Sequence, residues 1–162
     1  MIPERLAALR EKMRAYGVDA YLVPTADYHE SEYVGTYFKA RTYITGFTGS
    51  AGTAVITQDE ACLWTDGRYF VQAAKELAGT GVTLMKMGQE GVPTVEEYLA
   101  ANTKEGMTIG FDGRVVNEML GEALEKTLPE RFLSYRSDLI GEIWSDRPAL
   151  SAEPVWILDA KY

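Results

Sequence analysis

The sequence predicts an α/β fold, with a mixed β-sheet flanked by helices on both faces. Short apolar runs bounded by Pro and Gly indicate buried strands, and amphipathic segments with apolar residues three and four apart indicate helices. Strands and helices follow one another in mixed order, which favours a sheet covered on two sides. With 162 residues, of which 46% are hydrophobic, the chain can bury a core and fits one domain or one lobe of a larger protein.

The first helix is expected to begin near Pro3, because proline suits a first helical turn. Its apolar face is formed by Leu6, Leu9 and Met13. Gly17 can end it in a left-handed conformation. The apolar run Val18–Val23 then predicts a buried strand that stops at Pro24.

The middle of the chain predicts a β-hairpin. Tyr43–Phe47 and Thr53–Thr57 are interpreted as strands separated by the glycine-rich turn 48–52. Ala61–Thr65 follows after a short polar turn, so residues 53–65 are expected to pair as a hairpin.

The next elements are a helix, a strand and a second helix. Residues Gly67–Ala78 are predicted to be helical, and their apolar face is formed by Phe70, Ala73, Ala74 and Leu77. Val82–Met87 is expected to be a strand. Thr94 and Glu97 have the spacing of a capping box, which predicts a helix to about Ala101.

Four elements are predicted in the last third. Met107–Phe111 is expected to be a strand, and a helix that halts near Pro129 has a face formed by Val116, Leu120, Ala123 and Thr127. Phe132–Tyr135 is predicted to be a short strand and Asp138–Trp144 a short helix.

The end of the sequence predicts a boundary. Residues 1–148 are expected to form one domain, and 149–162 a linker or the start of a next domain, because a proline-marked polar stretch precedes the apolar run Val155–Leu158. The alternative is that Val155–Leu158 pairs with the edge of the same sheet.

Composition excludes several classes of protein. A net charge of −8 repels phosphate backbones and anionic headgroups, so neither nucleic acid nor a membrane surface is an expected partner. Cys62 is the single cysteine and is expected to be a small core residue in a reducing compartment. There is no run of about 20 apolar residues. We therefore expect a soluble, cytoplasmic protein.

The sequence offers no catalytic or metal-binding set. One histidine and one cysteine cannot supply a His/Cys zinc site, and neither a calcium loop nor a G-x-S-x-G elbow occurs. We therefore expect no catalytic residue and no metal ligand in this chain. His29 follows a predicted strand end, where α/β proteins often bind ligands, or it is a solvated loop histidine beside acids.

Glycines and arginines suggest structural corners. Gly46, Gly49 and Gly52 are expected to permit a tight turn and close backbone approach rather than to bind phosphate, because no Gly-Lys-Ser/Thr ending follows. In Asp66-Gly67-Arg68 and Asp112-Gly113-Arg114, the aspartate is expected to make the turn, the glycine to take an unusual backbone angle, and Asp66 to pair with Arg68. Arg41 either receives a carboxylate or is a surface charge.

Two long strings resemble one known family. Residues 46–53 read Gly-Phe-Thr-Gly-Ser-Ala-Gly-Thr and residues 64–70 read Trp-Thr-Asp-Gly-Arg-Tyr-Phe. Together with Trp-Ser-Asp-Arg-Pro at 144–148, they resemble the amino-terminal, creatinase/prolidase-like domain of Xaa-Pro aminopeptidases, also called aminopeptidase P, of the three-domain cytosolic type. The resemblance covers roughly residues 4–148.

The resemblance implies a non-catalytic role beside a metallopeptidase. Members hydrolyse the bond between an N-terminal residue and a following proline, with two metal ions, typically manganese, held in a carboxy-terminal domain that this sequence lacks. The chain alone is thus expected to be inactive, and its own catalytic domain, a homodimer partner and short proline-containing peptides are the implied partners. The resemblance places Phe38, Arg41 and Tyr43 near a substrate channel, and His29 joins them as a candidate.

Two alternatives remain at this point. The chain can be a stand-alone ligand-binding or dimerisation module without peptidase activity, or a member of the creatinase or prolidase branch. We expect the isolated chain to be a monomer or a weak dimer.

Overall fold

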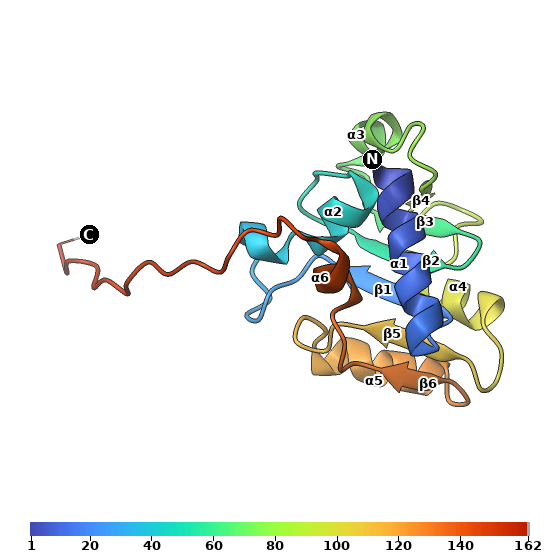
Figure 1. Cartoon of the computed structure of the whole chain (residues 1–162). Coiled ribbons are helices and arrows are strands. Elements are labelled where there is room, and N and C mark those ends of the chain that lie inside the picture. Colours follow the sequence, from blue (N-terminus) through green and yellow to red (C-terminus); the bar gives the residue numbers. More distant parts are fainter. Residues whose placement is uncertain (162) are drawn as a thin grey trace.

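A computed structural model describes residues 1–161 and shows a mixed sheet with helices on both faces (Figure 1). The strands are β1 (Ala20–Pro24), β2 (Thr53–Thr57), β3 (Ala61–Thr65), β4 (Thr83–Lys86), β5 (Thr108–Phe111) and β6 (Phe132–Ser134). The helices are α1 (Ile2–Tyr16), α2 (Ala40–Thr45), α3 (Phe70–Glu76), α4 (Val95–Asn102), α5 (Glu118–Thr127), α6 (Leu139–Ile143) and the 3₁₀ helix η1 (Thr36–Phe38). The predicted α/β class is confirmed.

The strands lie in the order β4-β3-β2-β1-β5-β6. Strand β2 runs antiparallel to both β1 and β3, whereas β1 and β5, β5 and β6, and β3 and β4 pair in parallel. The predicted hairpin of residues 53–65 is confirmed, with Thr53 opposite Trp64. Because β2 alone runs in the opposite direction, the carboxyl ends of the other five strands gather on one edge of the sheet.

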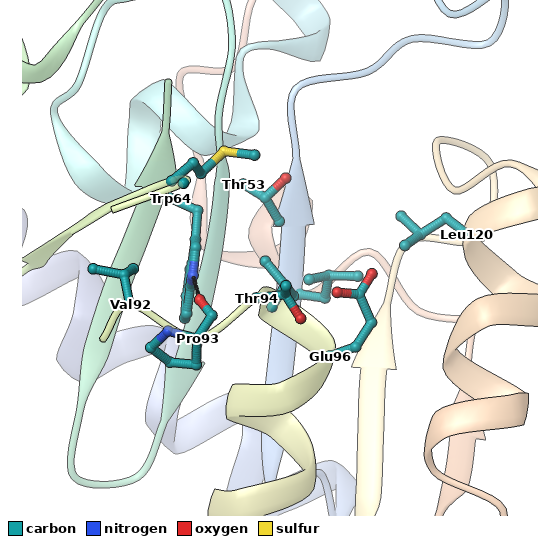
Figure 2. A pocket seen from close by; sticks show the side chains of 11 residues that line it. Thr53, Trp64, Val92, Pro93, Thr94, Glu96 and Leu120 are labelled. Carbon is teal, nitrogen blue, oxygen red and sulfur yellow. Dashed lines mark hydrogen bonds between the residues drawn. The ribbon is translucent and has the colours of Figure 1, made fainter. Parts of the chain in front are cut away.

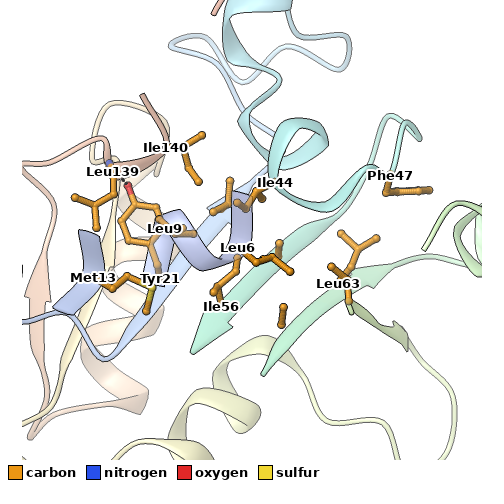
Figure 3. Packing of buried hydrophobic residues seen from close by; sticks show 14 of the residues in the cluster. Leu6, Leu9, Met13, Tyr21, Ile44, Phe47, Ile56, Leu63, Leu139 and Ile140 are labelled. Carbon is orange, nitrogen blue, oxygen red and sulfur yellow. Dashed lines mark hydrogen bonds between the residues drawn. The ribbon is translucent and has the colours of Figure 1, made fainter. Parts of the chain in front are cut away.

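Alternating side chains of the central strands fill two separate cores. In β1, Tyr21 and Val23 pack on one face, and Ala20 and Leu22 pack on the other. The first core lies under α1, α2, α3 and α6, with Leu6, Leu9 and Met13 of α1 packed over the sheet (Figure 3). The second core lies under α4 and α5. A sheet buried on both faces explains why its strands are nearly continuous apolar runs.

The predicted helix ends of α1 and α4 are confirmed. Gly17 has φ 65° and ends α1 with a left-handed cap. At the start of α4, the Thr94 backbone N–H donates to Glu97 Oε2 at 2.8 Å, and the Glu97 N–H donates to Thr94 Oγ1 at 3.2 Å. The other predicted elements are present with ends shifted by a few residues, except for one segment.

The prediction that Tyr43–Phe47 is a strand is wrong. Residues 40–45 form α2, which ends at Gly46 with φ 81°. The β-branched and aromatic residues favoured a strand locally, but the helix places Arg41, Ile44 and Thr45 in the interior. Tertiary burial of this face outweighs the local strand preference.

The last described residues leave the body of the domain. Residues 148–161 are exposed and extend away from the sheet (Figure 1). Val155 and Ile157 are 100% and 95% exposed, and the stretch around them forms no strand. The alternative in which Val155–Leu158 pairs with the sheet edge is therefore wrong. The domain boundary at 148 stays a prediction.

Cys62 lies on β3 and is 4% exposed, so its expected role as a small core residue is confirmed. Burial raises the pKa of its thiol. Among residues 1–161, no helix is both long enough and apolar enough to cross a membrane.

Candidate functional site at the carboxyl edge of the sheet

Several polar loops lie at the carboxyl edge of the sheet. Thr25 follows β1, Asp66–Arg68 follows β3, and Asp112–Arg114 follows β5. The loop that leads into β2, residues 46–52, reaches the same edge, because β2 begins where its neighbours end. In open α/β sheets this edge is where ligands commonly bind. It is therefore the candidate site.

Residues 46–52, here called the glycine loop, are held close to the protein body. A Cβ on Gly49 would lie 2.2 Å from a ring carbon of Phe47. A Cβ on Gly52 would lie 2.8 Å from the carbonyl oxygen of Trp64. The backbone approaches its neighbours closely at both positions, and a larger residue there would displace the Phe47 ring or the loop.

Arg41 organises the glycine loop from the inside. Its Nε donates to Thr25 Oγ1 at 2.9 Å, its Nη1 donates to the Phe47 carbonyl at 2.7 Å, and its Nη2 donates to the Gly49 carbonyl. The residue is 3% exposed, so the interpretation as a surface charge is wrong. Burial lowers the pKa of Arg41 to about 10, and the side chain is still charged at neutral pH.

Helix α3 holds the outer side of the glycine loop. The Thr48 backbone N–H and hydroxyl donate to the two oxygens of Glu76 at 2.8 and 2.7 Å. Although partial burial alone would raise the pKa of Glu76, hydrogen bonds from Thr48 and Gln72 lower it. The hydroxyls of Ser50 and Tyr69 lie 2.7 Å apart. The loop is thus fixed on both sides.

A polar hollow, here called the polar pocket, opens beside the glycine loop. Its two adjoining parts have volumes of about 230 and 270 Å³ and share Thr25, Glu32 and Ser50. Arg41 and Lys39 contribute to one part, and Arg68 contributes to the other. Hydroxyls, a carboxylate and cations of this kind can hydrogen-bond the charged ends and amide groups of a peptide.

The comparison with protein families matches residues 5–143 to the Creatinase/Prolidase N-terminal domain. The chain belongs to this family. The predicted resemblance is confirmed.

Relatives of this creatinase/prolidase amino-terminal domain are full-length peptidases. Aminopeptidase P2 of Arabidopsis thaliana is 41% identical over 100% of this chain and 24% of its own length. Probable Xaa-Pro aminopeptidase P of Talaromyces marneffei is 44% identical over 98% of this chain and 25% of its own length. The chain therefore spans about a quarter of the length of the curated relatives that it matches.

Solved structures of peptidases contain a domain with the same fold. The crystal structure of X-prolyl aminopeptidase from Caenorhabditis elegans, described as a cytosolic enzyme with a di-nuclear active site, has a TM-score of 0.90. It is 37% identical and covers 99% of this chain and 28% of its own. The Xaa-Pro aminopeptidase of Streptococcus thermophilus, with a TM-score of 0.67 and 24% identity over 88% of this chain and 97% of its own, shares the fold.

The four candidate channel residues of this creatinase/prolidase domain do not line one hollow. Only Arg41 lines the polar pocket. Phe38 packs edge-on against Tyr28 with ring centroids 4.7 Å apart. Tyr43 instead stacks on Trp144 at 4.5 Å, and the exposed His29 donates its backbone N–H to Asp27 Oδ1 at 2.8 Å.

Sequence reasoning missed Glu32, Thr25 and Ser50 as pocket residues. They come from segments that meet only in the folded domain. A signal did exist, because Thr25 directly follows a strand and Ser50 lies in a turn that leads into the neighbouring strand.

The ion pair predicted for Asp66 and Arg68 is present, and the second Asp-Gly-Arg corner has an equivalent pair that was not predicted. Arg68 Nε lies 2.9 Å from Asp66 Oδ1, and Arg114 Nη2 lies 2.8 Å from Asp112 Oδ2. The expected unusual backbone angle is wrong, because neither Gly67 nor Gly113 has a positive φ. At Gly113, close approach to Tyr135 takes its place.

A second, apolar hollow of about 340 Å³ lies at the start of α4. Figure 2 shows Trp64, Val92 and Pro93 on one side and Leu120 of α5 on the other. The Trp64 indole N–H is already used, since it donates to the Pro93 carbonyl at 2.8 Å. This hollow can accept an apolar group, and no sequence motif predicted it.

The side chains of this domain do not fit a dinuclear metal centre. Within the described range 1–161, no group of three or more His, Cys, Asp or Glu side chains converges closely enough to hold an ion. No step of a metal-dependent reaction can be derived from these residues.

Proposed function

We propose that this chain is the accessory amino-terminal domain of a metal-dependent Xaa-Pro aminopeptidase. The parent protein would remove an N-terminal residue that precedes proline and would act in the cytoplasm. The observation that supports the proposal is the sequence match between 98–100% of this chain and about a quarter of the length of each aminopeptidase P relative. A domain shared at 37–44% identity is expected to do the same work in each protein.

The proposed division of labour assigns the chemistry to the rest of the parent protein. Two metal ions, typically manganese, would be bound there and would activate a water molecule for attack on the peptide bond. The present chain, with one histidine and one cysteine, would contribute no metal ligand and no activity of its own. The di-nuclear site described for the Caenorhabditis elegans relative supports this division.

The accessory domain would contribute to the homodimer and limit access to short proline-containing peptides. The polar pocket supports the second role, because it lies at the carboxyl edge and presents Glu32, Arg68 and Ser50. The substrate channel at this edge would also include Phe38, Tyr43 and His29. Arg41 would act from beneath, by keeping the glycine loop in place.

A chimaera tests the proposal. The matching quarter of Arabidopsis thaliana Aminopeptidase P2 is replaced by this chain, and release of the first residue from Xaa-Pro peptides of increasing length is measured with manganese present. We expect the chimaera to cleave short peptides and to discriminate against long ones, whereas the same enzyme lacking this quarter loses the discrimination. The isolated chain is expected to release nothing.

Two outcomes would contradict the proposal. Cleavage by the isolated chain would place the chemistry in these residues. A folded chimaera that cleaves short and long peptides alike would remove the role in access and favour a separate binding module.

A further inference from the structure

One wall of the polar pocket is a loop with little secondary structure of its own. Residues 26–39, here called the site loop, connect β1 to α2 and contain only the short helix η1. Glu32, Tyr33 and Val34 of this loop line the polar pocket. The shape of the pocket therefore depends on what holds the site loop in place.

Arg147 is a well-shielded side chain that holds the site loop from the far end of the sequence. Its Nε donates to the Tyr37 carbonyl at 2.9 Å, and its guanidinium carbon lies 3.9 Å from the centre of the Tyr37 ring. Nη1 of the same side chain pairs with Asp138, the residue before α6. The Arg147 and Asp138 side chains are only 12% and 16% exposed. A guanidinium held by a carboxylate on one side can thus hold the loop on the other.

Aromatic contacts extend this hold along the loop. The ring of Tyr37 packs edge-on against Phe38 at 5.0 Å, and Phe38 packs edge-on against Tyr28 at 4.7 Å. Two further side chains reach the loop from outside: Asn117 donates to Glu30, and Arg114 lies 6.0 Å from the Tyr28 ring.

Arg147 also marks the place where the chain leaves the domain. Its backbone N–H donates to the Trp144 carbonyl at 3.1 Å, which closes the turn after α6. From Pro148 to residue 161, every residue is exposed. The side chain that holds the site loop therefore belongs to the residue directly before this exposed stretch.

The neighbouring helix leaves room for this arrangement. A Cβ on Gly141 of α6 would lie 2.8 Å from Arg147 Nη1 and 2.7 Å from Asp138 Oδ2. Alanine is otherwise preferred to glycine in a helix. The glycine at this position is thus matched to the Arg147–Asp138 pair and not to helix stability.

We propose that Arg147 is a positioning residue that holds the site loop over the polar pocket from the point where the chain leaves the domain. This inference goes beyond the proposed function and does not depend on it, because it concerns the geometry of the loop. A segment that follows Arg147 and changes its position would change the wall of the pocket with it.

Hydrogen exchange on the full chain tests the proposal. The variants Arg147→Ala and Arg147→Lys remove the Nε donor to Tyr37, and the lysine keeps a positive charge beside Asp138. Gly141→Ala keeps the Arg147 side chain but adds a Cβ that clashes with the Arg147–Asp138 ion pair. In all three, we expect backbone amides of residues 26–39 to exchange at least about tenfold faster, because the hydrogen bond from Arg147 to Tyr37 is removed in the two Arg147 variants and displaced in Gly141→Ala. Amides of β1, β2 and β3 are expected to keep their rates within about threefold.

Matched controls separate loop positioning from general stability. Arg136→Ala removes an exposed arginine, and Gly121→Ala adds a methyl to a helical glycine that has nothing within 4 Å of the new Cβ. Neither control should change exchange in the site loop. Unchanged loop exchange in both Arg147 variants would overturn the proposal, as would equal acceleration of the loop and the three strands.

Discussion

The two Asp-Gly-Arg corners have the same sequence and nearly the same local geometry. At the first, Arg68 Nε donates to Asp66 Oδ1 and Arg68 Nη2 donates to Asp66 Oδ2, both at 2.9 Å. At the second, Arg114 makes the same two contacts with Asp112 at 2.9 and 2.8 Å. In both, the arginine backbone N–H donates to the aspartate at 3.0 Å.

Their surroundings differ. The Arg68 and Asp66 side chains are 64% and 36% exposed, so the first corner lies in solvent. Asp112 is 15% exposed, and Arg114 also reaches Asp138 at 3.0 Å. Through Asp138 the second corner joins Arg147 and the site loop. A triplet can thus determine local geometry, while its neighbours decide how much it contributes to stability.

The largest expected difference between the corners is at their glycines. In Gly113→Ala, the new Cβ would lie 2.7 Å from the Tyr135 carbonyl oxygen, which already accepts the Gly113 N–H at 3.0 Å. We expect a loss of about 2 kcal/mol in the free energy of unfolding. In Gly67→Ala the nearest atom is 3.9 Å away, and a change within about 0.5 kcal/mol is expected. Urea denaturation of both variants makes the comparison, and equal losses would contradict it.

A smaller difference is expected at the arginines. Arg114→Ala removes hydrogen bonds to two partly shielded carboxylates, and about 1 kcal/mol of unfolding free energy should be lost after allowance for solvent screening. Arg68→Ala removes a solvent-exposed pair, and its unfolding free energy should fall by no more than about 0.5 kcal/mol. A clear loss in Arg68→Ala would show that the exposed corner also contributes.

The smallest effect concerns pH at the exposed corner. The hydrogen bond from Arg68 lowers the pKa of Asp66 below its ordinary value of 3.8. A carboxyl whose pKa is lower in the folded state stabilises the fold above its unfolded pKa, and this contribution disappears as the pH falls below about 4. The small midpoint difference between the unchanged chain and Asp66→Asn should therefore be present at pH 7 and absent near pH 2. A difference that grows towards low pH would reverse the assignment.

Most of the fold could be predicted because its signals are local. The capping box at Thr94, the left-handed cap at Gly17 and the hairpin of residues 53–65 each depend on neighbouring residues. The failure at Tyr43–Phe47 has a different cause. Its helix is stabilised by burying Ile44 in the first core and Arg41 against Thr25 and the glycine loop, and a short window of sequence contains neither the core nor Thr25.

The candidate site was predictable only in part. Arg41 and the glycine loop were identified from residue type and spacing, but whether Arg41 was buried could not be decided. The polar pocket requires Thr25, Glu32 and Ser50 to meet across three segments, and the hold of Arg147 on Tyr37 spans 110 positions. Such contacts follow from the pairing of strands and not from any motif.

The buried thiol of Cys62 gives the molecule a reporter of its own opening. It is the single cysteine, it lies on a strand inside the sheet, and only 4% of the residue is exposed. A thiol-specific reagent can reach it when β3 separates from the helices that cover it. The rate of modification of this thiol therefore measures how often β3 becomes accessible, without any engineered label.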